Sequence, residues 1–243
     1  FQTLCKAGGM KLDIRTGSKC VIYLNGTYWG VYDLREIPDD HDYTEYNYGQ
    51  GKYDLQYILT WGNTWAEYGG SQAITDWNTL RSYINTNNMA TQSNFDYVVS
   101  QLDLESLADY VIGHAISVSS DRLNYNTGWW RGMNPSGSHK RWGYILWDND
   151  ASFDFYINYT GIASTSYTAP VCQVDNLYMN PWSDPEGHTR ILKRLRNNPG
   201  FNNWYLNRYA DLMNTNFSCQ RMLGFLDSTK AVIDPEMTRQ CAR

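Results

Sequence analysis

Residues 121–150 read DRLNYNTGWWRGMNPSGSHKRWGYILWDND, and this stretch decides the fold. It begins with a polar loop that carries Asp121 and Asn126, and the loop leads into a short apolar run. A turn rich in Gly, Pro and Ser follows at residues 132–138, and a second apolar run, RWGYILW, ends at Asp148. Apolar runs bounded by turn signals predict paired strands. The stretch therefore predicts a hairpin whose second strand ends in acidic residues.

The segments before this loop predict a buried helix and a second hairpin. From Asp103 to Ser119, apolar residues recur at helical spacing and form a wide stripe, typical of a helix buried on most sides. Residues 19–36 read KCVIYLNGTYWGVYDLRE, in which two apolar runs flank Asn25-Gly26. This is a strong hairpin signal, because both turn residues must tolerate a positive φ. Little periodicity follows through about residue 70, which predicts a loop or lid.

Helical patterns dominate the rest of the chain. They predict helices over residues 72–88, 188–196, 201–213 and 218–233, with Asp234-Pro235 opening a last short turn. Residues 155–187 show no clear period. We expect an α+β protein with a β-rich part over residues 1–70 and a mostly helical lobe over residues 71–243, which carries the acidic site.

The composition excludes several classes of protein. The 243 residues include 20 basic and 25 acidic residues, for a net charge of −5. No apolar run approaches the roughly 18 residues that a bilayer crossing needs. The absence of a Lys/Arg block argues against nucleic acid as a partner. The 10 Trp, 20 Tyr and 7 Phe, together with many Asn, indicate a folded extracellular protein.

Five cysteines leave two interpretations open. Cys5, Cys20, Cys172, Cys219 and Cys241 are compatible with two disulfides and one remaining thiol. Proximity in the sequence suggests pairing of Cys5 with Cys20 and of Cys219 with Cys241. Buried free thiols are an equally good explanation. No zinc-binding spacing is present.

The acidic residues carry the chemical signal of the sequence. In protein kinases, a catalytic-loop Asp orients the attacking hydroxyl and an Asn five residues later holds a metal ion. A second Asp, beyond a following hairpin, holds the metal that bridges the phosphates. Asp121, Asn126 and Asp148 have this spacing. A turn or a calcium cluster at Asp148-Asn149-Asp150 fits the spacing as well, so the spacing alone leaves these alternatives open.

Several motifs resemble those of the spore coat protein H (CotH) family. VIYLNGTYWGVYDLRE at residues 21–36 resembles its hairpin signature, LNG-x-YWG-x-Y followed by Glu. LADYVIGHAISVSSDRLNYNTGWWRG at residues 107–132 resembles its helix and loop, and RWGYILWDNDASF at residues 141–153 resembles its W-D-x-D-x-x-F strand end. Residues 201–218 and 234–243 resemble its closing helices. The resemblance covers nearly the whole chain.

This resemblance implies an atypical protein-kinase-like fold in a protein that is secreted or displayed on the cell or spore surface. It implies the use of ATP with Mg or Mn to phosphorylate Ser or Thr of extracellular proteins. Asp121 would be the catalytic residue and Asn126 its metal-binding partner. Asp148 and Asp150 compete for the role of the metal-binding Asp.

The resemblance also assigns residues to the nucleotide, and it is incomplete there. Glu36 lies where the family keeps an acidic residue near the nucleotide cleft, and Arg131 either neutralises phosphate or pairs with an Asp. No Gly-rich phosphate loop is present, so Lys11 and Lys19 are phosphate-binding candidates by elimination only. The family's upstream β-rich segment is short here, so we expect part of the N-terminal lobe to be missing.

A non-catalytic role is the alternative hypothesis. The chain would then be a pseudokinase with a structural or carbohydrate-binding role, and its partners would be coat or filament proteins or a surface polysaccharide. Aromatic faces stack well on sugars, and the candidates are Trp61, Trp65, Tyr68, Trp129 and Trp130. A kinase requires its acidic residues to converge, whereas a lectin requires exposed aromatic rings.

Overall fold

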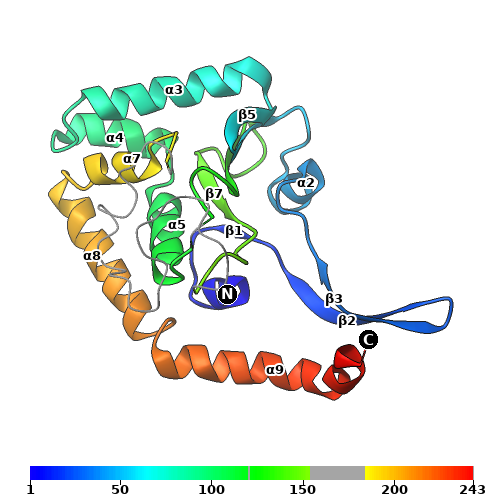
Figure 1. Ribbon diagram of the computed structural model, residues 1–243. Helices are drawn as coiled ribbons and strands as arrows, with labels where there is room; N and C mark the ends of the chain where they lie inside the picture. Colours follow the sequence, from blue (N-terminus) through cyan, green and yellow to red (C-terminus); the bar gives the residue numbers. More distant parts are fainter. Residues whose placement is uncertain (120, 154–183, 243) are drawn as a thin grey trace.

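The computed structural model describes residues 1–119, 121–153 and 184–242, and a five-stranded sheet lies at its centre (Figure 1). The strand order is β1-β7-β6-β4-β5, in which β1 is parallel to β7 and the other pairs are antiparallel. The strands are β1 (Asp13–Ile14), β4 (Leu55–Trp61), β5 (Asn63–Tyr68), β6 (Thr127–Gly132) and β7 (Gly143–Leu146). The sheet takes strands from both sides of residue 70, so that position is not a boundary between two structural units.

Helices cover one face of this sheet and form the main core with it. They are α3 (Gly70–Thr86), α4 (Gln92–Gln101), α5 (Leu104–Ile116), α7 (His188–Leu195) and α8 (Pro199–Asn214). The ring of Trp77 in α3 lies 5.2 Å from that of Trp129 and 5.6 Å from that of Trp142. Every residue of α5 except Glu105 is buried, so α5 is the helix on which this core is built.

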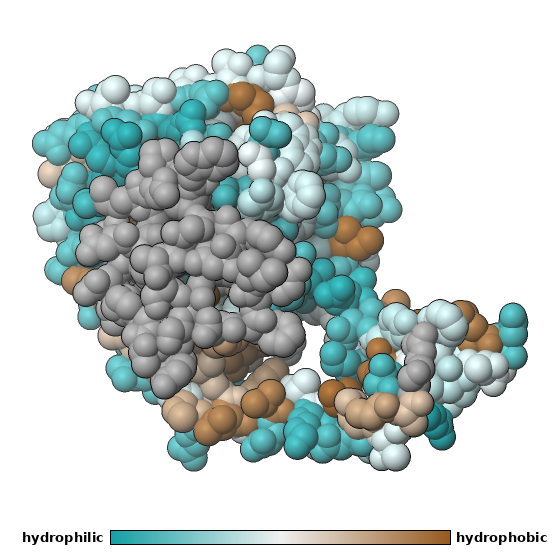
Figure 2. Space-filling view, in the orientation of Figure 1, coloured by the Kyte–Doolittle hydropathy of each residue, from teal (hydrophilic) through white to brown (hydrophobic). Residues whose placement is uncertain are grey.

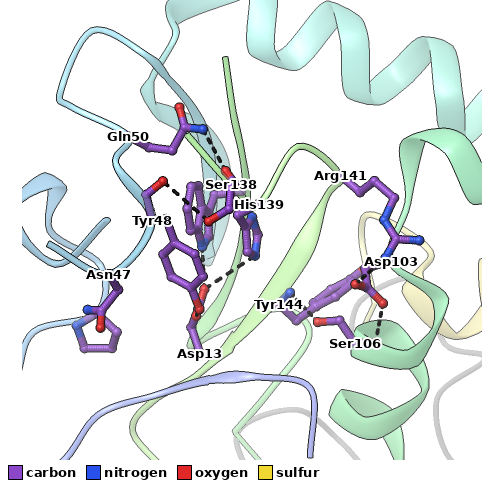
Figure 3. A network of polar contacts seen from close by, with 12 residues as sticks. Asp13, Asn47, Tyr48, Gln50, Asp103, Ser106, Ser138, His139, Arg141 and Tyr144 are labelled. Atoms are coloured by element: carbon purple, nitrogen blue, oxygen red, sulfur yellow. Dashed lines mark hydrogen bonds and ion pairs between the residues drawn. The ribbon is translucent and has the colours of Figure 1, made fainter. Parts of the chain in front are cut away.

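A buried carboxylate organises the opposite face of the sheet, where α2 (His41–Tyr48) packs. Asp13 accepts hydrogen bonds from Trp130 Nε1, at 2.6 Å, and from the hydroxyl of Tyr48 (Figure 3). The ring of His139 stacks on that of Trp130 at 3.8 Å, and its Nε2 lies 3.7 Å from the Asp13 carboxylate. Because each donor comes from a different segment, Asp13 fixes β1 against β6 and against the end of α2.

The hairpin of β2 (Gly17–Leu24) and β3 (Thr27–Arg35) lies apart from the central sheet. Its turn residues Asn25 and Gly26 have φ values of 50° and 80°, so the predicted turn is confirmed. The C-terminal end of the long helix α9 (Cys219–Cys241) lies beside the hairpin, whereas the short helix α1 (Gln2–Ala7) lies next to β1 (Figure 1). Gln240 at the end of α9 accepts a hydrogen bond from the Val31 amide of β3, at 3.0 Å.

The structure confirms most of the predicted elements and corrects others. The helices at α3, α5, α7 and α8 and the strands β6 and β7 are present. The loop predicted through residue 70 is wrong, because α2, β4 and β5 lie there. Strand β4 is buried on both faces, so its sequence LQYILTW lacks the alternation that indicates a strand. Helix α4 was not predicted, and α9 continues through Pro235 where a new turn was expected. Residues 155–183 of the aperiodic stretch lie outside the described residues.

Of the two interpretations of the cysteines, the structure supports free thiols and not the suggested pairs. Cys5, Cys20, Cys219 and Cys241 are free thiols, whereas Cys172 lies outside the described residues. Cys219 begins α9 and Cys241 ends it. At 1.5 Å per residue, the two are roughly 33 Å apart, too far for a bond.

The result is a mixed α+β protein with strands toward the N-terminus and helices toward the C-terminus. In the part of the chain that the structure describes, no helix has both the length and the apolar character to cross a bilayer.

One buried ion pair joins the helices to the N-terminal segment. The carboxylate of Asp109 in α5 is fully buried and accepts two hydrogen bonds from Arg208 of α8, at 2.9 and 3.0 Å. It also accepts from the amide of Lys11, at 2.8 Å, and Arg208 donates to the carbonyl of Gly9. The pair therefore holds α5, α8 and the connection between α1 and β1 together.

Arg208→Met leaves the buried Asp109 carboxylate without its cation, and we expect it to lower the free energy of unfolding by about 3–5 kcal/mol. Urea denaturation measures this loss. Arg141→Met is the matched control, because it breaks a more exposed pair with Asp103 and should lower the free energy by about 1 kcal/mol or less. Equal losses for the two variants would contradict the role given to Asp109.

Candidate active site

The loop after α5 is held rigidly by buried polar contacts. The guanidinium of Arg122 is buried and donates hydrogen bonds to the carbonyls of His114 and Ser119, the latter at 2.8 Å. These carbonyls lie at the C-terminal end of α5, where a cation is stabilised by the helix dipole. Thr127 Oγ1 at the other end of the loop accepts from the amide of Leu123, at 2.8 Å. Both ends of the loop that carries Asp121 are therefore fixed by the core.

The loop brings Asp121 and Asn126 together. Asn126 Nδ2 donates to Asp121 Oδ2 at 2.9 Å, which leaves the amide oxygen of Asn126 available to a cation. Asn126 is buried and Asp121 is half-buried. A five-residue loop achieves this contact because Leu123 and Asn126 both have positive φ values, 67° and 50°.

The end of β7 supplies two further carboxylates. β1 pairs in parallel with β7 up to Leu146, and the chain then turns sharply at Asp148, which has a φ of 34°. Asp148 and Asp150 are both exposed at this turn.

The loop and the strand end are coupled electrostatically. The pKa of Asp121 is raised from its ordinary value of 3.8 to about 6. Burial is the largest cause, and the negative charges of Asp148 and Asp150 contribute the rest of the increase. Burial and Asp150 likewise raise the pKa of Asp148, against the opposing effect of Arg15 and Arg35. The three carboxyl groups thus repel one another at one place, and a divalent cation would relieve that repulsion.

A cleft of about 780 Å³ opens beside this acidic group. Asp148, Asn149 and Asp150 line it on one side. A second side is apolar and comes mainly from α1 and α9, with Phe1, Leu4, Phe153, Met222, Leu223, Phe225 and Leu226. A third side is formed by the start of β2 and the end of β3, with Arg15, Thr16, Lys19, Asp33 and Arg35. The cleft therefore offers an apolar wall, an acidic edge and a basic edge to one ligand.

Of the residues predicted for the acidic site, Asp148 and Asp150 line the cleft, whereas Asp121 and Asn126 are not among its lining residues. Asp121, Asn126, Asp148 and Asp150 form the group just described. Glu36 is exposed and accepts hydrogen bonds from the amide and the hydroxyl of Thr16, which lower its pKa. It closes the base of the hairpin and is not among the residues that line the cleft.

The prediction that Arg131 binds the nucleotide needs correction. Its guanidinium forms an ion pair with Asp76 of α3 at 2.8 Å and also donates to Gln56 and Gln101. It stacks over the ring of Trp142 as well. Arg131 therefore ties the sheet to the helices, which is the second of its two predicted roles.

The lysine candidates are also placed. Lys19 lines the cleft, but it forms an ion pair with Asp33 across the hairpin at 2.7 Å. Lys11 lines a different pocket, between α4, α5 and α8. Sequence reasoning missed Arg15 and Arg35, which no motif marks. Their only sequence signal is a place next to strand ends, and β1 is too short to be recognised.

The sugar-stacking surface is largely excluded. Trp129 and Trp130 are fully buried. The hydroxyl of Tyr68 lies 3.3 Å from His41 Nδ1, and its ring packs against that of Tyr57. Trp61 and Trp65 alone of the five candidates are exposed. The set therefore does not form one platform of exposed rings.

This combination of a rigid Asp-x₄-Asn loop, a neighbouring acidic strand end and a cleft is typical of kinase-like proteins. The sequence model of the CotH kinase protein family matches residues 7–243, and the chain belongs to that family. A comparison with curated proteins gives no match. Family membership implies a kinase-like fold and the use of ATP.

Asp121→Asn should stabilise the protein at neutral pH. The folded-state pKa of about 6 exceeds the ordinary 3.8, so ionised Asp121 destabilises the fold above that range and has no such effect below about pH 4. We expect the melting temperature to rise by a few degrees at pH 7.5 and the gain to vanish at pH 4, as measured by circular dichroism. Asp227→Asn, at an exposed position on α9, is the control and should change little. A gain that persists at pH 4 would refute the electrostatic origin.

Proposed function

We propose that this chain is a metal-dependent Ser/Thr protein kinase that acts outside the cytoplasm, as a secreted protein or on the cell or spore surface. The observation that carries the proposal is the convergence of Asp121, Asn126, Asp148 and Asp150 beside the cleft. Structural carboxylates are normally paired with cations, whereas here neighbouring negative charges, together with burial, raise the pKa of Asp121 and of Asp148.

The donor set fits a hard divalent cation. Mg²⁺ and Mn²⁺ prefer carboxylate and amide oxygens, and they keep positions open for phosphate oxygens. Asp148, Asp150 and the amide oxygen of Asn126 would hold the ion. When bound, ATP supplies the phosphoryl group and the cation neutralises charge on the phosphates.

The residues of the chain then supply orientation and proton acceptance. Asp121 would accept a hydrogen bond from the Ser or Thr hydroxyl of the substrate, and its carboxylate is mostly ionised at neutral pH because its pKa is about 6. Asn126 holds that carboxylate in place through its 2.9 Å hydrogen bond. Burial of the loop restricts water near the reacting hydroxyl, which favours transfer to the substrate over hydrolysis.

A structural role without catalysis is the second candidate, and the surface supports it. Large apolar side chains are exposed on the hairpin and on α9, among them Leu24, Trp29, Leu34, Leu226 and Val232. Figure 2 shows the brown, apolar residues that gather along α9. Exposed apolar patches commonly mark contacts with other proteins, such as those of a coat or filament.

Nucleotide binding separates the two candidates. We expect the protein to bind ATP only with Mg²⁺ or Mn²⁺ and to transfer the γ-phosphate to Ser or Thr of an acceptor protein. Asp148→Ala should abolish metal-dependent ATP binding, whereas Asp121→Ala should retain binding and lose phosphoryl transfer by about 10²-fold or more. Calorimetry and a radiolabelled-ATP transfer assay measure the two steps.

Asp227→Ala is the control for both assays, because this exposed carboxylate lies on α9 outside the cleft lining. A folded protein that binds no nucleotide with either metal would refute the kinase and leave the structural role. Loss of ATP binding in Asp121→Ala would instead refute the separation of catalytic and metal-binding roles.

A further inference from the structure

The basic edge of the cleft contains two arginines without ionic partners. Arg15 follows β1 and Arg35 ends β3, and both line the cleft. Neither forms an ion pair with any carboxylate in residues 1–119, 121–153 or 184–242. The nearby carboxylate of Asp33 forms an ion pair with Lys19 and with neither arginine.

Arg15 is held in place by neutral groups. Its Nε donates to Gln2 Oε1 at 3.0 Å, and Gln2 Nε2 donates in turn to Asn149 Oδ1 at 3.2 Å. The amide of Gln2 thus links the basic edge to the acidic edge and fixes the orientation of both side chains. The remaining donors of the Arg15 guanidinium are left for another acceptor.

A second observation at the same place points to a missing acceptor. Asn149 Nδ2 is buried and has no hydrogen-bond partner. A buried donor left unpaired is costly, so such groups commonly mark the position of a ligand. Asn149 lines the cleft together with both arginines.

The charges of the cleft indicate what this acceptor is. Burial and the positive charge of Arg35 lower the pKa of Arg15, while the negative charges of Asp148, Asp39 and Asp33 oppose this shift without forming an ion pair with Arg15. An anion bound between the two arginines would relieve their mutual repulsion. The same anion would be repelled by Asp148, so a cation would be needed between the anion and Asp148. A polyphosphate with a bound divalent metal satisfies both edges, and a planar guanidinium binds phosphate oxygens in pairs.

We propose that Arg15 and Arg35, with the amide group of Asn149, bind the phosphate groups of the nucleotide. The proposal rests on the kinase function proposed above and names its phosphate subsite. These side chains take the part that a Gly-rich loop and a lysine have in other kinases. Two arginines, one after β1 and one at the end of β3, suit a chain of phosphates better than a single phosphate group.

Binding of ATP, AMP and inorganic tripolyphosphate to the full chain tests the subsite without a catalytic readout. Calorimetry with Arg15→Gln and Arg35→Gln should show affinity for ATP and tripolyphosphate weakened about tenfold or more by each variant, because a charge-assisted hydrogen bond is lost. The affinity for AMP should change less, so the preference for ATP over AMP should fall. Arg15→Lys keeps the charge and should restore part of the affinity, which separates loss of the subsite from misfolding.

Arg190→Gln is the matched control, since Arg190 is exposed on α7 and does not line the cleft. Normal ATP binding and phosphoryl transfer in both cleft variants would overturn the phosphate subsite and leave the kinase intact. Tripolyphosphate binding that depends on Arg15, without any ATP binding, would keep the anion site and overturn the nucleotide. If Arg190→Gln weakened the affinity for ATP and tripolyphosphate as much as the cleft variants do, the loss would come from the net charge of the protein, and the proposal would be overturned.

Discussion

The mutual repulsion of Asp121, Asp148 and Asp150 is the constraint around which the structure is arranged. The groups come from two segments, and nothing in their own chemistry favours their proximity without a cation. The fold supplies the opposing force through buried contacts, with Arg122 at the end of α5 and the β1–β7 pairing beneath the strand end. Strain is stored here as well. Five of the seven described non-glycine residues with positive φ lie near these carboxylates, namely Val118, Leu123, Asn126, Asp148 and Phe153.

The cleft joins parts of the chain that are far apart in sequence. Its acidic edge belongs to the central sheet, its basic edge to the hairpin, and its apolar wall to α1 and α9. Gln2 bridges the two charged edges, and the Asp13 network holds β1 directly before Arg15. The distance between the edges therefore depends on short contacts near the N-terminus and not on the large helical core.

The sequence predicts the acidic side of this site far better than the basic side. The pair of Asp121 and Asn126 and the strand end at Asp148 are local patterns, because each is fixed by a few neighbouring residues. The helix and the hairpin around them also have a clear hydrophobic periodicity. Arg15 and Arg35 lie at the open end of the predicted hairpin, where Gly17 pairs with Arg35, but no motif marks either arginine as a ligand. Arg131 is the opposite case. It lies next to a motif and was a candidate for binding the nucleotide, but it forms an ion pair with Asp76 and stacks over Trp142. Strands β4 and β5 escaped prediction because burial on both faces removes the period of two from β4.

The lack of any buried side chain along α9 has a kinetic consequence. Segments with few buried apolar contacts open at a small fraction of the global unfolding free energy. The backbone amides of α9 and of the hairpin that it contacts through Gln240 should thus exchange hydrogen with solvent far sooner than those of α5. One half of the cleft then samples open states on a short timescale, while the strained acidic loop stays closed until the whole molecule unfolds.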